Sequence, residues 1–221
     1  MKRYGFRYFW FFVGVLINSF GAAFITKSAL GTAPISSLPY VLSFQFPPTL
    51  GQFSFLVNIS LLLLQIALLR RKFPPLQLLQ IPATVVFSSF LDVSMGLLSW
   101  LQPSSFPGKL ITLLIGCCIL AFGITIEVAP DILVVPGEGI VRVIAQVSGK
   151  RFGSVKVALD VTLVSTAVIL SLLFFHRLQG VGIGTVISAL LVGRLVNLFN
   201  RRLPFLPRII ALRQPEQPAQ S

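Results

Sequence analysis

Six apolar runs, each about as long as a bilayer crossing, constrain this chain more than any other feature. They cover roughly 8–26, 51–69, 76–97, 109–127, 154–175 and 179–199. A transmembrane helix needs about 20 mainly apolar residues. Only 11% of the residues are charged, against about 25% in a soluble domain. The sequence therefore predicts an all-α fold, a polytopic membrane bundle of six helices with no soluble domain.

Basic residues predict the orientation of this bundle. The net charge is +12, but the basic residues cluster at the ends of apolar runs, which disfavours nucleic-acid binding. Four regions fall on one side of a six-span topology: 2–7, 70–72, 142–151 and 201–213. We therefore expect a multi-pass membrane protein with cytoplasmic N- and C-termini. The tail at 201–221 is basic and then Pro- and Gln-rich, and it is expected to lack structure from Leu203.

An internal repeat is the second organising feature. A shift of 102 residues aligns the chain on itself without a gap, and it superposes Gly14 on Gly116, Gly21 on Gly123, Pro34 on Pro136 and Asn58 on Asp160. The single transmembrane domain, 1–200, would then contain repeat one at 8–97 and repeat two at 109–199. Because three spans per repeat is an odd number, the second repeat must be inverted in the membrane.

Each repeat is predicted to contain a short broken helix after its first span. Pro34 and Pro136 suit the first turn of a helix, where the missing N–H costs nothing, so we predict short helices at 34–44 and 136–148. Irregular backbone at membrane depth must be buried in protein or line water. The alternative is that both segments are interfacial surface connectors. The N-terminus of a buried short helix would favour an anion.

Charged residues inside the apolar chain supply the candidate site. Ionisable groups in membrane spans mark functional sites by default. Pairs four residues apart share a helical face, and the predicted substrate-binding set is Glu138, Arg142, Lys156 and Asp160, with Asn58 from repeat one. Asp92 and Arg194 occupy equivalent repeat positions and are expected to form structural ion pairs. The alternative for the whole set is ion pairing that only fixes helix register.

Other motifs carry little chemistry. Cys117 and Cys118 are adjacent and are interpreted as small apolar fillers, with no His or further Cys spaced for a metal. The glycines of GVGIGT at 180–185 are expected to allow close packing. We find no nucleophile–base–acid set, so the sequence predicts no enzyme, no cofactor and no metal, and a membrane enzyme is the least favoured alternative.

Two motifs resemble a known family. PGEGIVRVIAQVSGKRFGSVKVALDVTLV at 136–164 and LGTAPISSLPYVLS at 30–43 are similar to the YczE-like family of bacterial integral membrane proteins, which is grouped with YyaS and YitT. The resemblance covers about 8–200. The resemblance implies a multi-spanning and largely uncharacterised protein of the bacterial inner membrane, and it carries over no substrate. Family members often have charged or polar residues where this chain has GVGIGT.

These observations favour a transporter or permease for a small polar or anionic metabolite. The alternative is a non-transporting accessory or scaffold protein that positions a partner or a lipid. A water-filled pocket between the broken segments would favour transport, and ion pairs without such a pocket would favour the accessory role. The expected partners are the lipid bilayer and a small-molecule substrate, with a homodimer left open and no nucleic acid.

Overall fold

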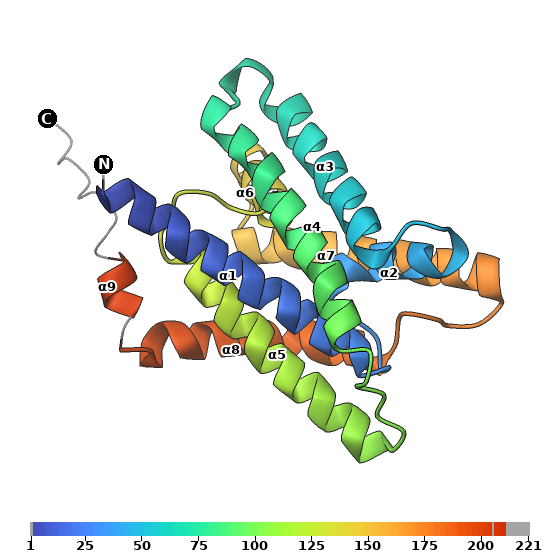
Figure 1. Ribbon diagram of the computed structural model, residues 1–221. Helices are drawn as coiled ribbons and strands as arrows, with labels where there is room; N and C mark the ends of the chain where they lie inside the picture. Colours follow the sequence, from blue (N-terminus) through green and yellow to red (C-terminus); the bar gives the residue numbers. More distant parts are fainter. Residues whose placement is uncertain (1, 205, 211–221) are drawn as a thin grey trace, which may run out of the picture.

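The computed structural model describes residues 2–204 and 206–210, and regular structure within these residues is helical throughout (Figure 1). Six helices are long and apolar enough to cross a membrane, as predicted. They are α1 (Lys2–Lys27), α3 (Leu50–Leu69), α4 (Gln80–Leu97), α5 (Phe106–Val128), α7 (Phe152–Phe175) and α8 (Ile183–Arg202). Between them lie the short helices α2 (Pro34–Gln45) and α6 (Pro136–Ser148), the 3₁₀ turns η1 (Arg70–Lys72) and η2 (Pro75–Leu79), and α9 (Leu206–Ile210) after α8.

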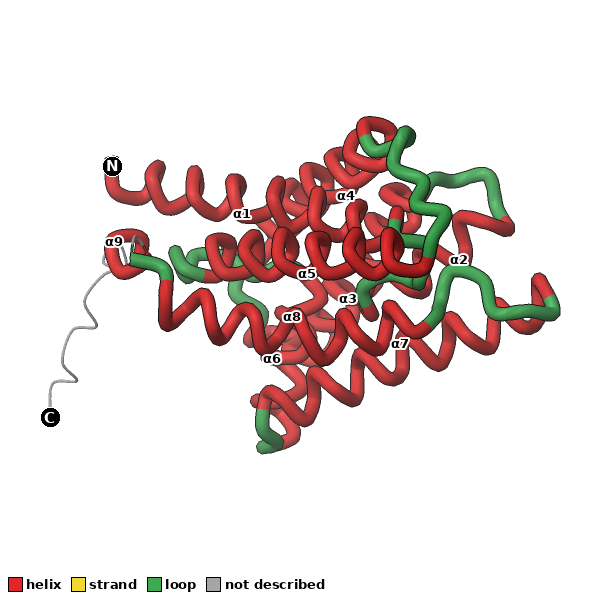
Figure 2. Tube along the Cα trace, turned by 90° about the horizontal axis from the view of Figure 1, so that it is seen from below, coloured by secondary structure: helices red, strands yellow, loops and turns green. Residues whose placement is uncertain are grey.

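α1 and α5 form the centre of the bundle and run antiparallel along each other (Figures 1 and 2). Half or more of the apolar window of each is buried, against 17% for α7 and for α8. Glycines make the close approach possible, because a Cβ at these positions would collide with the facing backbone. The facing pairs are Gly14 with Glu127, Gly21 with Leu120, Gly116 with Ile25 and Gly123 with Asn18.

The short helices cross between the two halves of the chain. α2 packs on α7, and α6 packs on α3. Pro34 and Pro136 each lie in the first turn, as predicted, and the preceding residues Ala33 and Val135 are extended. An apolar cluster holds the four helices together, with Leu61, Ile140, Val141 and Val155 at its centre. The sequence therefore predicted both short helices correctly.

The sequence-based boundaries are wrong at two places. α8 begins at Ile183 rather than near 179, because Gly180 has φ +80° and Gly184 is bonded outside the helix, its N–H donating to the Leu30 carbonyl at 2.8 Å. The start of the tail is also ordered, since α9 buries Leu206 and Ile209 beside Trp10. The predicted tail residues 211–221 lie outside the described residues.

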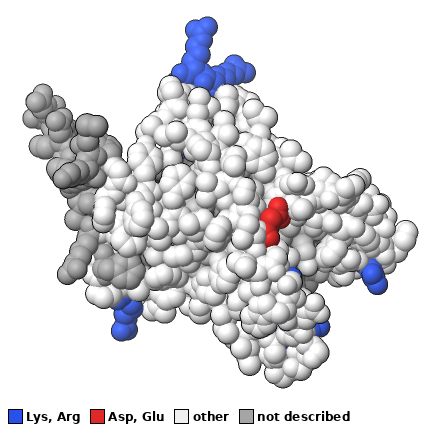
Figure 3. Space-filling view, in the orientation of Figure 1, with Lys and Arg blue, Asp and Glu red and all other residues white. Residues whose placement is uncertain are grey.

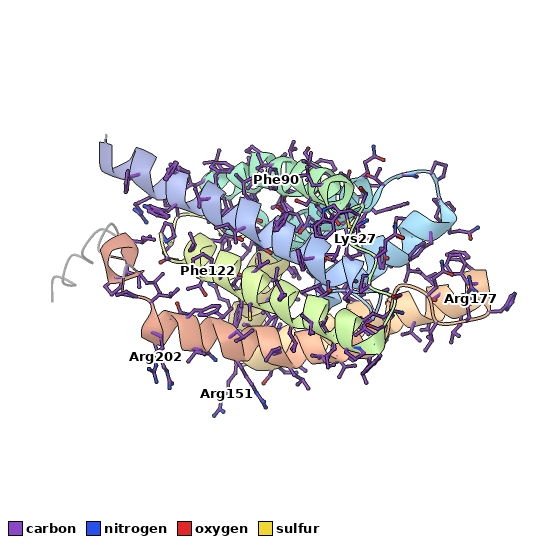
Figure 4. All side chains as sticks on the ribbon, turned by 60° about the horizontal axis from the view of Figure 1, so that its bottom comes forward. Lys27, Phe90, Phe122, Arg151, Arg177 and Arg202 are labelled. Atoms are coloured by element: carbon purple, nitrogen blue, oxygen red, sulfur yellow. The ribbon has the colours of Figure 1, made fainter. Side chains whose placement is uncertain are left out.

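The outer surface suits a lipid environment. Figure 3 shows a face that is almost free of charge, with basic side chains at its edges and one acidic spot within it. Large apolar side chains are exposed along the spans, among them Leu63, Leu173, Leu190 and Val157. Figure 4 shows Arg151 and Arg177, which flank α7, projecting from the body of the protein at separate places. This is a membrane protein whose several apolar helices present their outer faces to lipid.

Candidate functional site

The predicted pairing of Lys156 with Asp160 is present on α7. The Lys156 ammonium donates to the Asp160 carboxylate at 2.6 Å, and the two side chains are 32% and 20% exposed. Both groups belong to one helix, four residues apart, so the pair does not tie α7 to another element. Because the pair is only partly buried, the attraction between its charges contributes less to stability than that of a fully desolvated pair would.

Arg142 pairs with a residue that the sequence reasoning did not select. Its guanidinium lies 3.8 Å from the carboxylate of Asp131, and both side chains are about half exposed. Asp131 precedes α6 and has φ +51°. Glu138, one turn before Arg142, is partly exposed. Its carboxylate accepts no hydrogen bond and forms no ion pair within the described part of the chain. The helical spacing of Glu138 and Arg142 therefore did not predict the actual ion pair.

Glu127 is a second site residue that sequence reasoning missed. It lies in the last turn of α5 and is 2% exposed, and Asn18 of α1 donates from Nδ2 to Glu127 Oε2 at 2.7 Å. Both residues interrupt otherwise apolar spans, and this was the signal that could have found them. They face each other because α1 and α5 approach closely along their glycines.

Two buried glutamines position the start of α6. Gln65 of α3 donates from Nε2 to the Pro136 carbonyl at 3.0 Å and to Gln80 Oε1 at 3.3 Å. Both glutamines are fully buried. Gly139 lets the Gln65 amide approach, since a Cβ there would collide with it. A buried amide needs such partners, so this contact fixes the register of α6 against α3.

The charged groups around the start of α6 form one electrostatic set. Glu138 is acted on electrostatically by Lys156, Arg142 and Asp160, and it acts in turn on Glu127. Arg7 lies at the edge of the set and donates to the carbonyls of Pro130 and Asp131. Among the side chains that the structure describes, the set contains four carboxyl groups and three basic groups. The carboxyl groups belong to Glu127, Asp131, Glu138 and Asp160. The basic groups belong to Arg7, Arg142 and Lys156.

The remaining predicted residues lie outside this set. Asn58 is buried but donates to the Ser54 carbonyl of its own helix at 2.8 Å, and no hydrogen bond joins it to Asp160. Asp92 accepts from Thr49 Oγ1 at 2.5 Å and from the Gly51 N–H at 2.8 Å, so it caps α3 instead of pairing with a cation. Arg194 is exposed and has no ion pair among the described residues. The expected ion pairing of Asp92 and Arg194 is therefore wrong.

Two pockets lie away from the charged set. One, of about 570 Å³, opens between α3 and α4 and is lined by Pro48, Gln52, Phe55, Leu56, Val85, Ser88, Ser89 and Asp92. The other, of about 410 Å³, lies between α2 and the loop before α8, and its lining includes Gly31, Tyr40, Phe44 and Gly180. Neither pocket is lined by any of the five predicted substrate-binding residues.

Comparison with known proteins places the sequence among uncharacterised membrane proteins. The family of unknown function DUF6198 matches residues 5–201. Two Bacillus subtilis (strain 168) proteins are similar: the uncharacterized membrane protein YczE, 24% identical over 86% of this chain and 84% of its own, and the uncharacterized protein YyaS, 26% identical over 87% and 92%. No solved structure matches.

Proposed function

The chain belongs to the family of unknown function DUF6198, and from this premise we propose that it transports a small polar metabolite rather than catalysing a reaction. One observation carries the proposal. Charged and amide side chains from both halves of the chain converge at the start of α6, where this short helix meets α3. Polar groups in a membrane bundle are costly, and they line solute paths by default. The surplus of carboxyl groups favours a polar or cation-bearing solute over an anion.

We further propose that the two halves form an inverted repeat. The facing pairs of α1 and α5 are reciprocal under the 102-residue shift: Gly14 faces Glu127, and their counterparts Gly116 and Ile25 face each other. The crossings of α2 on α7 and of α6 on α3 are reciprocal in the same way. A translational repeat would not produce reciprocal contacts, whereas a two-fold axis would. Secondary transporters commonly use this plan, with the site at the repeat interface.

The proposed setting is the bacterial inner membrane, with both termini in the cytoplasm. We expect that a single cysteine at Ser104, in a background without Cys117 and Cys118, reacts with an impermeant maleimide in intact cells. A cysteine at Gln214 should react only after lysis. If intact cells label Gln214→Cys but not Ser104→Cys, the orientation is the opposite of the one proposed.

Transport can be tested by uptake of a panel of labelled polar metabolites into cells that lack the gene. Re-expression of the wild type should restore uptake of at least one solute. Asp160→Asn should lower that uptake about tenfold or more, because losing a hydrogen bond to a charged group costs about 1.5–3 kcal/mol. Arg194→Gln, which changes an exposed charge on α8, is the matched control and should transport normally.

The membrane content of both variants, measured by immunoblot, should equal that of the wild type. If Asp160→Asn supports full uptake at equal protein level, the site assignment is wrong. If no solute in a broad panel depends on the gene, transport itself loses its support.

A second candidate is a membrane accessory protein that positions a lipid or a partner. The observation that favours it is the location of the pockets, since the larger one opens on the α3–α4 surface and not at the charged set. Native mass spectrometry of the protein extracted with its lipids distinguishes the two functions. An accessory role predicts a retained lipid or protein that Ser88→Leu displaces, with no solute uptake that depends on Asp160.

A further inference from the structure

We propose that Glu127 binds a monovalent cation, either a proton or Na⁺, deep between α1 and α5, and that Glu138 shares this cation. The role of that ion in driving transport rests on the proposed function. The binding site itself can be tested without a transported solute.

The burial of Glu127 is the first argument. Its side chain is 2% exposed, and a single amide, that of Asn18, donates to Oε2. Oε1 accepts no hydrogen bond from any residue that the structure describes. An ionised carboxylate in such a place costs several kcal/mol unless a positive charge is close. Because no described basic side chain forms an ion pair with it, we assign the compensating positive charge to a bound cation.

The electrostatic surroundings are the second argument. The titratable group whose charge acts on Glu127 is Glu138, another carboxyl, which lies on α6. Glu127 also lies in the last turn of α5, where the unpaired carbonyls of the helix carry partial negative charge. Arg7, from α1, donates to the carbonyls of Pro130 and Asp131. Burial, the neighbouring carboxyl and the helix end therefore all favour uptake of a cation.

A purely structural role for the Asn18–Glu127 hydrogen bond is less consistent with the rest of the interface. Under the 102-residue shift, Leu120 corresponds to Asn18 and Ile25 corresponds to Glu127. Both apolar residues are buried at the other end of the same helix pair, where Gly21 and Gly116 make the close contact. Close packing of α1 on α5 therefore does not need a polar pair, and the carboxyl group is in excess of what the fold requires.

Glu138 connects this site to the predicted solute site. Its charge acts on Glu127, and it is itself subject to the charges of Lys156, Arg142 and Asp160. A polar solute whose hydrogen-bond acceptors bind to Arg142 or Lys156 reduces the positive potential that these two groups exert at Glu138. The Glu127–Glu138 pair then holds its cation more tightly, so that solute and ion bind cooperatively through one coupling free energy.

The test uses the full chain reconstituted in liposomes and a hydrophobic carbodiimide, which modifies protonated carboxyl groups in apolar surroundings. Near neutral pH, peptide mass spectrometry should find Glu127 modified at least about tenfold faster than the exposed Asp131, an internal control, since tenfold corresponds to about 1.4 kcal/mol of differential protonation. Glu127→Gln, which keeps the acceptor for Asn18, should remove only this modification. Glu138→Gln should slow it, because a neighbouring negative charge has been removed.

Two arms identify the cation. Protection of Glu127 by added Na⁺ at constant pH assigns sodium, and protection only by raising the pH assigns a proton. Thermal unfolding gives a second readout that does not require the reagent to reach the site. The bound cation should raise the melting temperature of the wild type but not that of Glu127→Gln. The proposal is overturned if unfolding of the wild type and Glu127→Gln responds identically to pH and Na⁺ and Glu127 is not selectively modified. A positive result alongside absent uptake would retain the cation site while removing the transport function.

Discussion

The stretches that precede α2 and α6 have the same local shape but are held by different chemistry. Ala29 and Asp131, 102 residues apart, both adopt left-handed backbone, with φ of +57° and +51°. The residues before each helix, Ala33 and Val135, share φ of −63°. Each stretch then enters its short helix through a proline. The equivalent positions of the two halves therefore encode the same turn and the same helix start.

The partners of these stretches differ. Before α2 they are neutral: Thr26 Oγ1 lies 2.8 Å from Thr32 Oγ1, and the Thr32 N–H donates to Thr185 Oγ1 at 3.2 Å. Before α6 they include the guanidinium of Arg7 at 2.7 Å from the Pro130 carbonyl. The same backbone shape is therefore held by neutral hydrogen bonds before α2 and by a charged donor, Arg7, before α6.

Of two substitutions that test this comparison, Arg7→Met should lower the free energy of unfolding more. It leaves the buried carbonyl of Pro130 and the partly buried carbonyl of Asp131 without the Arg7 donor, and we expect a loss of roughly 2–4 kcal/mol of unfolding free energy. Arg177→Met, which removes an exposed guanidinium at the end of α7, is the matched control and should cost little. Denaturant unfolding in detergent, followed by tryptophan fluorescence, measures both. Equal losses would mean that Arg7 does not hold the loop.

Thr185→Val should lower the free energy of unfolding less. The substitution keeps the shape of the side chain but removes the acceptor for the Thr32 N–H, and we expect a loss of about 1 kcal/mol. Thr162→Val, on the exposed face of α7, is the control and should be nearly neutral. The same unfolding measurement applies. A loss for Thr185→Val that exceeds that of Arg7→Met would invert the comparison and make the neutral stretch the more strongly held one.

The sequence predicted the elements well and the site only in part. Span-length apolar runs set the six long helices, and Pro34 and Pro136 set the short ones, because these signals are local. The Lys156–Asp160 pair was also accessible, since helical spacing alone brings the two groups together. Arg142 was misassigned because its partner Asp131 lies in a loop whose left-handed turn no spacing rule describes.

What the sequence by itself determined was the membrane class and the helix boundaries to within a few residues. Only the tertiary structure decided which polar groups of different elements meet. Asn18 and Glu127 are more than a hundred positions apart, and they come into contact because facing glycines let α1 and α5 approach closely. The residues of a helix determine that the helix forms, whereas a buried polar contact depends on how two helices cross. That crossing is a property of the whole packed bundle.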